Sequence, residues 1–368
     1  MRITFVLPNF PEVPIGGYRV VYEYANRLAS RGHRVSVVHP RRLALSSPKN
    51  PYRRVRRRAR GILDRLFPPG VDWQPIDRRV SMLYVPDLRP RHVPDGDAVF
   101  ATAWQTADHV LGFPCSKGVK FYLIQHYETW AGPKEQVDAT WRAPLHKVVI
   151  AKWLLELGRE LNCEDMQYIP NGIDHARYRL VSPIANRPKQ VAMMYSVQEW
   201  KGSRDGLRAL AIVKDGCPHL RVVLFGTPER PESIAEWIEY RQNPPQAELV
   251  NEIYNGSSIF LCASWTEGFP LPPAEAMACG CGVATADCGG IHEFAEHEVT
   301  ALISPPRDPE ALARNIARLL EDDGLRQRLA KAGHDRVQSF TWERSTDQLE
   351  RFVRLHAASA KVGSDRLG

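Results

Sequence analysis

Short apolar runs alternate with helical patterns along this chain, and this alternation constrains the fold more than any other feature. Residues 3–7 and 35–38 are strand-like, and residues 20–29 between them place apolar side chains on one helical face that ends at Gly32. A strand, a helix and a second strand in this order predict a parallel sheet with a right-handed crossover. The alternation starts again at residue 191, so the sequence predicts two α/β domains.

The remaining elements follow from the same patterns. Further strands are predicted at 82–85, 98–101, 120–125, 148–150, 191–195, 222–225, 259–262, 283–286 and 301–303. Helices are predicted at 205–214, 246–255, 309–320, 325–339 and 343–356. Residues 180–188 contain two prolines and several polar side chains, as linkers do, and 368 residues suffice for two domains of ordinary size. We therefore place the domain boundary between residues 182 and 183.

Two glutamates eight positions apart, Glu267 and Glu275, mark the most informative loop. The apolar strand at 259–262 precedes it, and the helix-forming residues 274–278 follow the prolines at 272–273, which suit a first helical turn. This order directs free backbone N–H groups and the positive end of the helix dipole into the loop, which is a site for an anion such as a diphosphate. We expect Glu275 in the first helical turn and both carboxylates to accept hydrogen bonds from sugar hydroxyls.

This block resembles the signature of two glutamates separated by seven residues in retaining family 4 glycosyltransferases, the glycosyl transferases group 1. The resemblance implies an α/β protein with the GT-B fold, in which two Rossmann-like α/β/α domains face each other across a cleft. Residues 1–182 would then bind the acceptor, residues 183–340 would bind the nucleotide-sugar donor, and a helix in 341–368 would pack back toward the first domain.

The resemblance also implies roles for single residues around the donor. Glu267 would contact the transferred sugar and Glu275 the ribose of the nucleotide. The donor would also be bound by the residues that follow the first glutamate, which are Gly268, Phe269, Pro270 and Leu271. Family members often have glycine where this chain has Pro270, and proline has no N–H to donate, so Phe269 and Leu271 would have to supply the N–H groups.

Two further segments of the first domain match the family in order. Gly16 and Gly17 resemble its N-terminal glycine loop, which lies near the donor phosphate and the acceptor, although two glycines alone predict only a turn. His126 follows the strand at 120–125, and the carboxyl end of a parallel strand is where ligands bind. A lone histidine is more often structural, but the resemblance implies that His126 contacts the transferred sugar.

Lys201 and Gly202 resemble the Lys-Gly pair of the family's donor site. A lysine there can neutralise a departing diphosphate, while the alternative is a solvated surface lysine. Ser196 occupies a donor-site position where family members usually have arginine, so one cation of the family's phosphate clamp is missing at this position. Arg204 is one basic residue that could replace it.

Cysteine content and hydropathy bear on location and cofactors. Seven scattered cysteines argue against a disulfide framework and favour a reducing cytoplasm, and the cluster at 279–288 lacks the spacing of a zinc site. The sequence contains no apolar run of about 18 residues, so it predicts no membrane-spanning helix. The resemblance implies a retaining hexosyl- or deoxyhexosyltransferase that needs no metal or other cofactor. It would move a sugar from a nucleotide sugar to a cytoplasm-facing glycan or lipid-linked acceptor, in cell-surface polysaccharide or glycolipid biosynthesis.

The net charge of +7 is concentrated in one segment. Residues 41–67 carry ten Lys or Arg against the single acid Asp64, and residues 52–67 place their apolar side chains on one helical face. Such a helix can lie in an anionic membrane surface, which would make the protein peripheral on the inner face of the cell membrane, or pack on the first domain with its arginines in solvent. No aromatic platform accompanies the arginines, so nucleic acid is not expected as a partner.

Two other functions stay open at this stage. One is a related enzyme that hydrolyses or epimerises a nucleotide sugar, and the other is a non-catalytic membrane-binding protein. A dehydrogenase and a P-loop kinase are disfavoured, because neither Gly-x-Gly-x-x-Gly after the first strand nor Gly-x4-Gly-Lys-Ser/Thr occurs.

Overall fold

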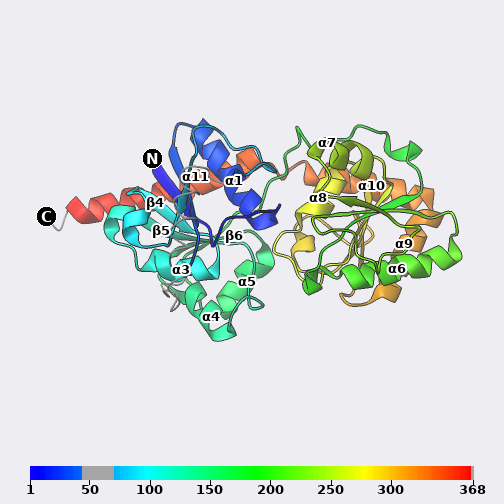
Figure 1. Ribbon diagram of the computed structural model, residues 1–368, viewed down its shortest axis with the longest axis horizontal. Coiled ribbons are helices and arrows are strands. Elements are labelled where there is room, and N and C mark those ends of the chain that lie inside the picture. Colours follow the sequence, from blue (N-terminus) through cyan, green and yellow to red (C-terminus); the bar gives the residue numbers. More distant parts are fainter. Residues whose placement is uncertain (44–69, 366–368) are drawn as a thin grey trace, which may run out of the picture. The chain divides into compact units, whose positions relative to one another are not determined.

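The computed structural model describes residues 1–43 and 70–365, with side chains up to residue 359 (Figure 1). The chain forms two compact units: unit 1 comprises Met1–Ile169 and Trp342–Gly368, and unit 2 comprises Pro170–Thr341. The basic segment 52–67 lies outside the described residues. Within those residues, no helix combines the length and the apolar character needed to cross a bilayer.

Unit 1 is built on a parallel sheet with the strand order β3-β2-β1-β4-β5-β6-β7. Its strands are β1 (Arg2–Val6), β2 (Arg34–Pro40), β3 (Ser81–Val85), β4 (Ala98–Ala101), β5 (Val119–Ile124), β6 (His146–Val149) and β7 (Met166–Tyr168). The chain leaves β1 toward β2 and later returns to β4 on the other side of β1. The order therefore reverses between β1 and β4, which is where ligands bind in open α/β sheets.

Helices cover both faces of this sheet (Figure 1). The helices are α1 (Gly16–Ser30), α3 (Trp104–Leu111), α4 (Lys134–Arg142), α5 (Lys152–Glu160) and α11 (Trp342–Asp365), with 3-10 turns at Pro90–His92 and Cys115–Lys117. The helices α1 and α11 lie on one side, and α3, α4 and α5 lie on the other.

The last helix belongs to unit 1 although it follows unit 2 in the sequence. The indole of Trp342 is buried, and its ring meets the Tyr24 ring of α1 edge to face at 5.4 Å. Glu350 of α11 accepts hydrogen bonds from Arg31 at 2.9 Å and pairs with His33 at 3.0 Å. Aromatic packing and a charged cluster thus hold α11 against α1.

Unit 2 has a second parallel sheet with the order β10-β9-β8-β11-β12-β13. Its strands are β8 (Gln190–Met194), β9 (Arg221–Gly226), β10 (Glu239–Gln242), β11 (Ile259–Cys262), β12 (Gly282–Ala286) and β13 (Leu302–Ser304). The chain runs from β8 outward to β10 and then returns to β11 on the other side of β8. The strand order reverses between β8 and β11.

Unit 2 is also a three-layer structure, with α6 and α9 on one face of the sheet and α8 and α10 on the other (Figure 1). Its helices are α6 (Ser203–Gly216), α7 (Gln246–Glu248), α8 (Leu271–Ala278), α9 (Pro309–Glu321) and α10 (Asp323–Val337), with a π-helix at Leu249–Tyr254 and 3-10 turns at Ile184–Asn186, Glu199–Lys201 and Gly290–Glu293. Apolar side chains of α6, α9 and the strands form one core cluster.

The segment with linker-like composition packs on unit 2. Arg187 is 6% exposed and donates hydrogen bonds to the Asn255 side chain at 3.0 Å and to the Tyr254 carbonyl at 3.2 Å. The N–H of Val181 donates to the same Asn255 oxygen at 2.8 Å. The division into units between residues 169 and 170 therefore differs from the boundary inferred from composition.

Candidate active site

The site in unit 2 lies where the strand order reverses, at the carboxyl ends of β8 and β11. Lys201 ends the 3-10 turn Glu199–Lys201 that follows β8, and Glu267 lies in the loop that follows β11. Since parallel strands present their carboxyl ends at the same edge, these two residues meet although they are 66 positions apart.

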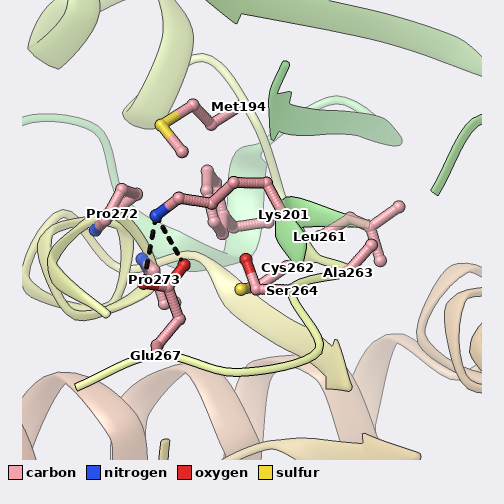
Figure 2. Close-up of a pocket in the computed structure, with 10 residues that line it drawn as sticks. Met194, Lys201, Leu261, Cys262, Ala263, Ser264, Glu267, Pro272 and Pro273 are labelled. Atoms are coloured by element: carbon pink, nitrogen blue, oxygen red, sulfur yellow. Dashed lines mark hydrogen bonds and ion pairs between the residues drawn. The ribbon is translucent and has the colours of Figure 1, made fainter. Parts of the chain in front are cut away.

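Lys201 and Glu267 form an ion pair (Figure 2). The Lys201 ammonium lies 2.7 Å from one Glu267 oxygen and 3.0 Å from the other, and the side chains are 24% and 12% exposed. Burial lowers the pKa of the Lys201 ammonium, but the charge and hydrogen bonds of Glu267 outweigh burial and leave that pKa raised. Lys201 is therefore cationic at neutral pH and keeps a partly exposed face.

Backbone contacts fix the turn that carries Lys201. The N–H of Trp265 donates to the Trp200 carbonyl at 2.7 Å, and the Trp265 indole donates to Asp205 of α6 at 2.7 Å. Gly202 has φ +61°, and a Cβ there would lie 1.9 Å from the Ala263 carbonyl oxygen. Only glycine fits this approach without strain, so Gly202 holds the Lys201 turn against the end of β11.

The loop that carries Glu267 is fixed in the same way. The Glu267 N–H donates to the Cys288 carbonyl at 2.9 Å, and the Glu267 carbonyl accepts from Gly290 N–H at 3.2 Å. A Cβ on Gly290 would lie 2.2 Å from the Gly268 carbonyl oxygen. Phe269 points its ring into an aromatic cluster, 5.3 Å from the ring of Phe294. The side chain of Phe269 anchors the loop, so only its backbone can serve a ligand.

The start of α8 offers fewer hydrogen-bond donors than its position suggests. The N-cap is Pro270, and Leu271, Pro272 and Pro273 are the first three helical residues. Prolines have no N–H, so Leu271 is the one residue of these four that can donate. The helix dipole still favours an anion at this end. An anion here would therefore rely on Lys201 more than the strand-loop-helix pattern alone predicts.

Glu275 lies deeper than predicted. It is the fifth residue of α8, in the second turn, and the prediction of a first-turn position is wrong because the helix already begins at Leu271. The residue is 3% exposed, and its Oε2 accepts a hydrogen bond from the Tyr254 hydroxyl at 3.3 Å. A ribose that binds Glu275 must reach a carboxylate that is almost covered.

A small pocket adjoins the ion pair and leaves room for about one water molecule. Figure 2 shows the Lys201 side chain extending through it toward Glu267, with Pro272 and Pro273 of α8 close by. Its other lining residues are Met194, Phe260, Leu261, Cys262, Ala263 and Ser264. The pocket is mainly apolar except for the ion pair, so the charges of Lys201 and Glu267 dominate its electrostatics.

Ser196 and Arg204 do not line this pocket. The N–H of Ser196 donates to the Ser203 hydroxyl at 2.9 Å, and that hydroxyl donates to the Ser196 carbonyl at 2.8 Å. Ser196 therefore closes the loop before α6. Arg204 is exposed in the first turn of α6.

In unit 1, the two glycines open a helix. Gly16 and Gly17 form the start of α1, where the first N–H groups have no partner within the helix, so the prediction of a loop there is wrong. The Gln125 side-chain amide donates to the Gly17 carbonyl at 3.0 Å. A Cβ on Gly17 would lie 3.4 Å from that amide, which is an ordinary contact, so the hydrogen bond of Gln125 is what joins α1 to the end of β5.

His126 follows Gln125 at the end of β5. Its Nδ1 accepts a hydrogen bond from the Tyr127 N–H at 2.8 Å, so a neutral imidazole carries its proton on Nε2. The rings of Trp130 and Trp153 meet it edge to face at 4.4 and 5.5 Å. These contacts hold the ring in one orientation with Nε2–H as a donor.

Three residues near these sites escaped the sequence analysis. Gln125 and Glu128 flank His126, and their place after a buried strand is the signal that could have identified them. Glu128 accepts a hydrogen bond from Trp104 N–H at 2.9 Å, and burial raises its pKa to about 7 against the opposing effect of that bond. Tyr254 reaches Glu275 from a distant helix, and no local pattern reveals this contact.

The two sheets and their helices define the class of the protein, which is the GT-B fold. The structure of sucrose-phosphate synthase from Thermosynechococcus elongatus is similar with a TM-score of 0.73 and 18% identity, over 97% of this chain and 99% of that one. Anabaena HepE in complex with UDP-glucose is similar with a TM-score of 0.68 and 16% identity, over 96% and 99% of the two chains. At these identities the likeness shows the fold alone.

The sequence of unit 2 is similar to a known family. The model of the family described as "Glycosyl transferases group 1" matches residues 174–336, which make up most of unit 2. The D-inositol 3-phosphate glycosyltransferase of Salinispora tropica is 29% identical over 204 residues, which are 50% of this chain and 42% of the relative. The alignment thus spans less than half of that relative's length.

Proposed function

We propose that this protein transfers a sugar from a nucleotide-sugar donor to an acceptor with retention of the anomeric configuration. The observation that carries the proposal is the Lys201–Glu267 pair, placed beside α8 where the strand order of unit 2 reverses. A cation, a helix dipole and a carboxylate at one ligand-binding edge suit a diphosphate joined to a sugar. The match of residues 174–336 to the model of the glycosyl transferases group 1 supports this assignment.

The ion pair suggests how the donor would use these groups. A diphosphate that approaches Lys201 competes with Glu267 for the ammonium, because each is an anion that the same cation can bind. Once the phosphate holds the ammonium, the Glu267 carboxylate can accept hydrogen bonds from sugar hydroxyls. Lys201 and the Leu271 N–H then stabilise the negative charge that grows on the departing diphosphate.

The remaining roles complete the proposal. Glu275 binds the ribose, His126 donates through Nε2–H to the transferred sugar, and no metal takes part in the transfer. We also propose that Gly16 and Gly17 serve the donor phosphate and the acceptor, and that Ser196, Gly268, Phe269 and Pro270 shape the donor loops. We further propose a cytoplasmic protein that acts on a glycan or lipid-linked acceptor in cell-surface polysaccharide or glycolipid biosynthesis. HepE binds UDP-glucose, so UDP-glucose is the first hexosyl donor to test. The name of the Salinispora tropica relative adds D-inositol 3-phosphate to the acceptors to be tested.

The test compares Glu267→Gln with the wild-type protein on UDP-, GDP- and dTDP-sugars with a panel of acceptors. We expect kcat/KM to fall by about 10² or more, as on loss of one transition-state contact, while the nucleoside diphosphate still binds. Glu310→Gln serves as a control, since Glu310 is a half-exposed carboxylate of unit 2 paired with Arg208. Transfer at the wild-type rate in Glu267→Gln would remove Glu267 from the reaction. Release of free sugar alone, with no dependence on any acceptor, would favour a hydrolase.

A further inference from the structure

Three side chains of unit 1 bring metal-ligating atoms together away from the candidate active site. His146 is the first residue of β6, Asp165 directly precedes β7, and His356 lies in α11. One ring nitrogen from each histidine and one carboxylate oxygen all lie within 4.8 Å of one another. His146 Nδ1 is hydrogen bonded to Asp165 Oδ2, and His356 Nε2 lies 3.8 Å from Asp165 Oδ1.

The backbone holds two of these ligands in place. The Lys147 N–H, next to His146, donates to the Asp165 carbonyl at 3.0 Å, so strand pairing sets the spacing of the two residues. Asp165 has φ +53°, a left-handed conformation that aspartate and asparagine adopt more readily than most residues. The Lys147 ammonium donates to the Ala143 carbonyl at 2.8 Å and to the Glu164 carbonyl at 3.3 Å, which fixes both loops at this edge.

Aromatic packing holds the third ligand. The rings of His146 and His356 stack with their centres 3.7 Å apart. Phe352, one turn earlier in α11, meets the His356 ring edge to face at 4.6 Å and the Phe121 ring of β5 at 5.8 Å. The side chains of His146, Asp165 and His356 are 33%, 42% and 19% exposed, so an ion can reach the cluster, and small rotations of the two stacked rings would aim their nitrogens at it.

We propose that His146, Asp165 and His356 bind one divalent first-row transition-metal ion, with Zn²⁺ as the best match. Two imidazoles and one carboxylate, with water in a fourth position, are a frequent zinc ligand set. Bonds of about 2 Å to each ligand would replace the direct hydrogen bond between His146 and Asp165. His146 and Asp165 lie at the amino ends of β6 and β7, away from the carboxyl edge that serves substrates in such sheets. The ion would therefore tie α11 to the sheet and take no part in transfer.

The experiment uses the full chain without an affinity tag, freed of metal by a chelator and titrated with Zn²⁺ in a calorimeter. We expect one ion per chain and a rise in melting temperature of roughly 5 to 10 °C at a hundredfold excess over Kd. Asp165→Asn keeps a residue that tolerates the left-handed backbone, and His356→Ala removes the ligand on α11. Each variant should bind Zn²⁺ at least about tenfold more weakly, since even indirect partners of a metal contribute this much.

A matched control separates this cluster from other zinc-binding side chains. His219 is exposed in unit 2, outside the cluster, so His219→Ala should bind Zn²⁺ as the wild-type protein does. Co²⁺ provides a second probe, because its visible absorption reports the ligands directly and should change in Asp165→Asn. Absence of stoichiometric Zn²⁺ binding, or unchanged Kd values in both cluster variants, would overturn the proposal. So would a chelator that abolishes transfer without lowering the melting temperature.

Discussion

Gly202 offers the sharpest structural test of the donor site, because a single methyl group there must displace backbone. A Cβ at Gly202 would lie 1.9 Å from the Ala263 carbonyl oxygen, whereas real contacts of this kind are essentially never shorter than 3.0 Å. Gly202→Ala must therefore move the Lys201 turn away from the end of β11 by about 1 Å. The left-handed backbone adds a cost of its own, since φ is +61°.

The two costs can be added. The left-handed conformation costs an L-residue about 1–2 kcal/mol, and an overpacked contact costs about 1–3 kcal/mol. We expect Gly202→Ala to lower the free energy of unfolding by about 2–5 kcal/mol and to weaken binding of a nucleoside diphosphate, because Lys201 moves with the turn. Gly216→Ala at the other end of α6 is the matched control. Its Cβ would meet nothing within 4 Å, so it should stabilise the protein by about 0.4–1 kcal/mol.

Urea unfolding and calorimetric titration measure both effects. If Gly202→Ala unfolded at the wild-type urea concentration and bound the nucleotide with unchanged affinity, the close approach of this turn to β11 would be wrong.

Two further predictions concern unit 1 and pH. Burial raises the pKa of Glu128 to about 7 from its usual 4.5. The folded protein therefore binds the proton of the Glu128 carboxyl group more tightly than the unfolded chain does. As a result, the free energy of unfolding falls as pH rises between these two values. Glu128→Gln should flatten this dependence by up to about 3 kcal/mol in urea titrations from pH 4.5 to 8, and an unchanged slope would contradict the assignment. Burial raises the pKa of Glu350, but hydrogen bonds from Arg354, Arg31 and His33 outweigh burial and hold this pKa at about 2. The stabilisation of the folded protein by the Glu350 carboxylate is therefore lost as pH falls from 4.5 toward 2. Glu350→Gln should lower the free energy of unfolding by about 1.5–3 kcal/mol at pH 7. The control Glu343→Gln, at a side chain that is 69% exposed, should change it by no more than about 0.5 kcal/mol. Equal effects of the two substitutions would mean that Glu350 does not hold α11.

Much of the fold could be predicted from local patterns. The strand at 259–262 matches β11, and the predicted strand at 98–101 matches β4, because both are short apolar runs with clear ends. The edge strand β10 (Glu239–Gln242) was missed because its side chains are charged or polar and no apolar run marks it. The helix predicted at 246–255 is present, but its second part is a π-helix, a distinction that apolar periodicity does not resolve.

The candidate site shows where local reasoning ends. The sequence places Lys201 and Glu267 each after a strand, but their pairing depends on β8 lying beside β11, a long-range choice of strand order. The burial of Glu275 depends on Tyr254, which arrives from another helix. By contrast, the loss of N–H donors at α8 could have been counted from the sequence, since Pro270, Pro272 and Pro273 are all visible there.

The affinity of unit 2 for a nucleoside diphosphate tests these roles most directly. Leu271 is the one residue of Pro270, Leu271, Pro272 and Pro273 with an N–H group to donate. Lys201 must therefore supply most of the binding free energy for a diphosphate. The measurement is the Kd of UDP, GDP and dTDP for the wild-type protein, for Lys201→Met and for the exposed-lysine control Lys331→Met, by titration calorimetry. We predict that at least one nucleotide binds, that Lys201→Met weakens it by about 10- to 150-fold, and that Lys331→Met leaves it unchanged. Equal affinity in Lys201→Met and the wild-type protein, or no binding of any of the three nucleotides, would contradict the account.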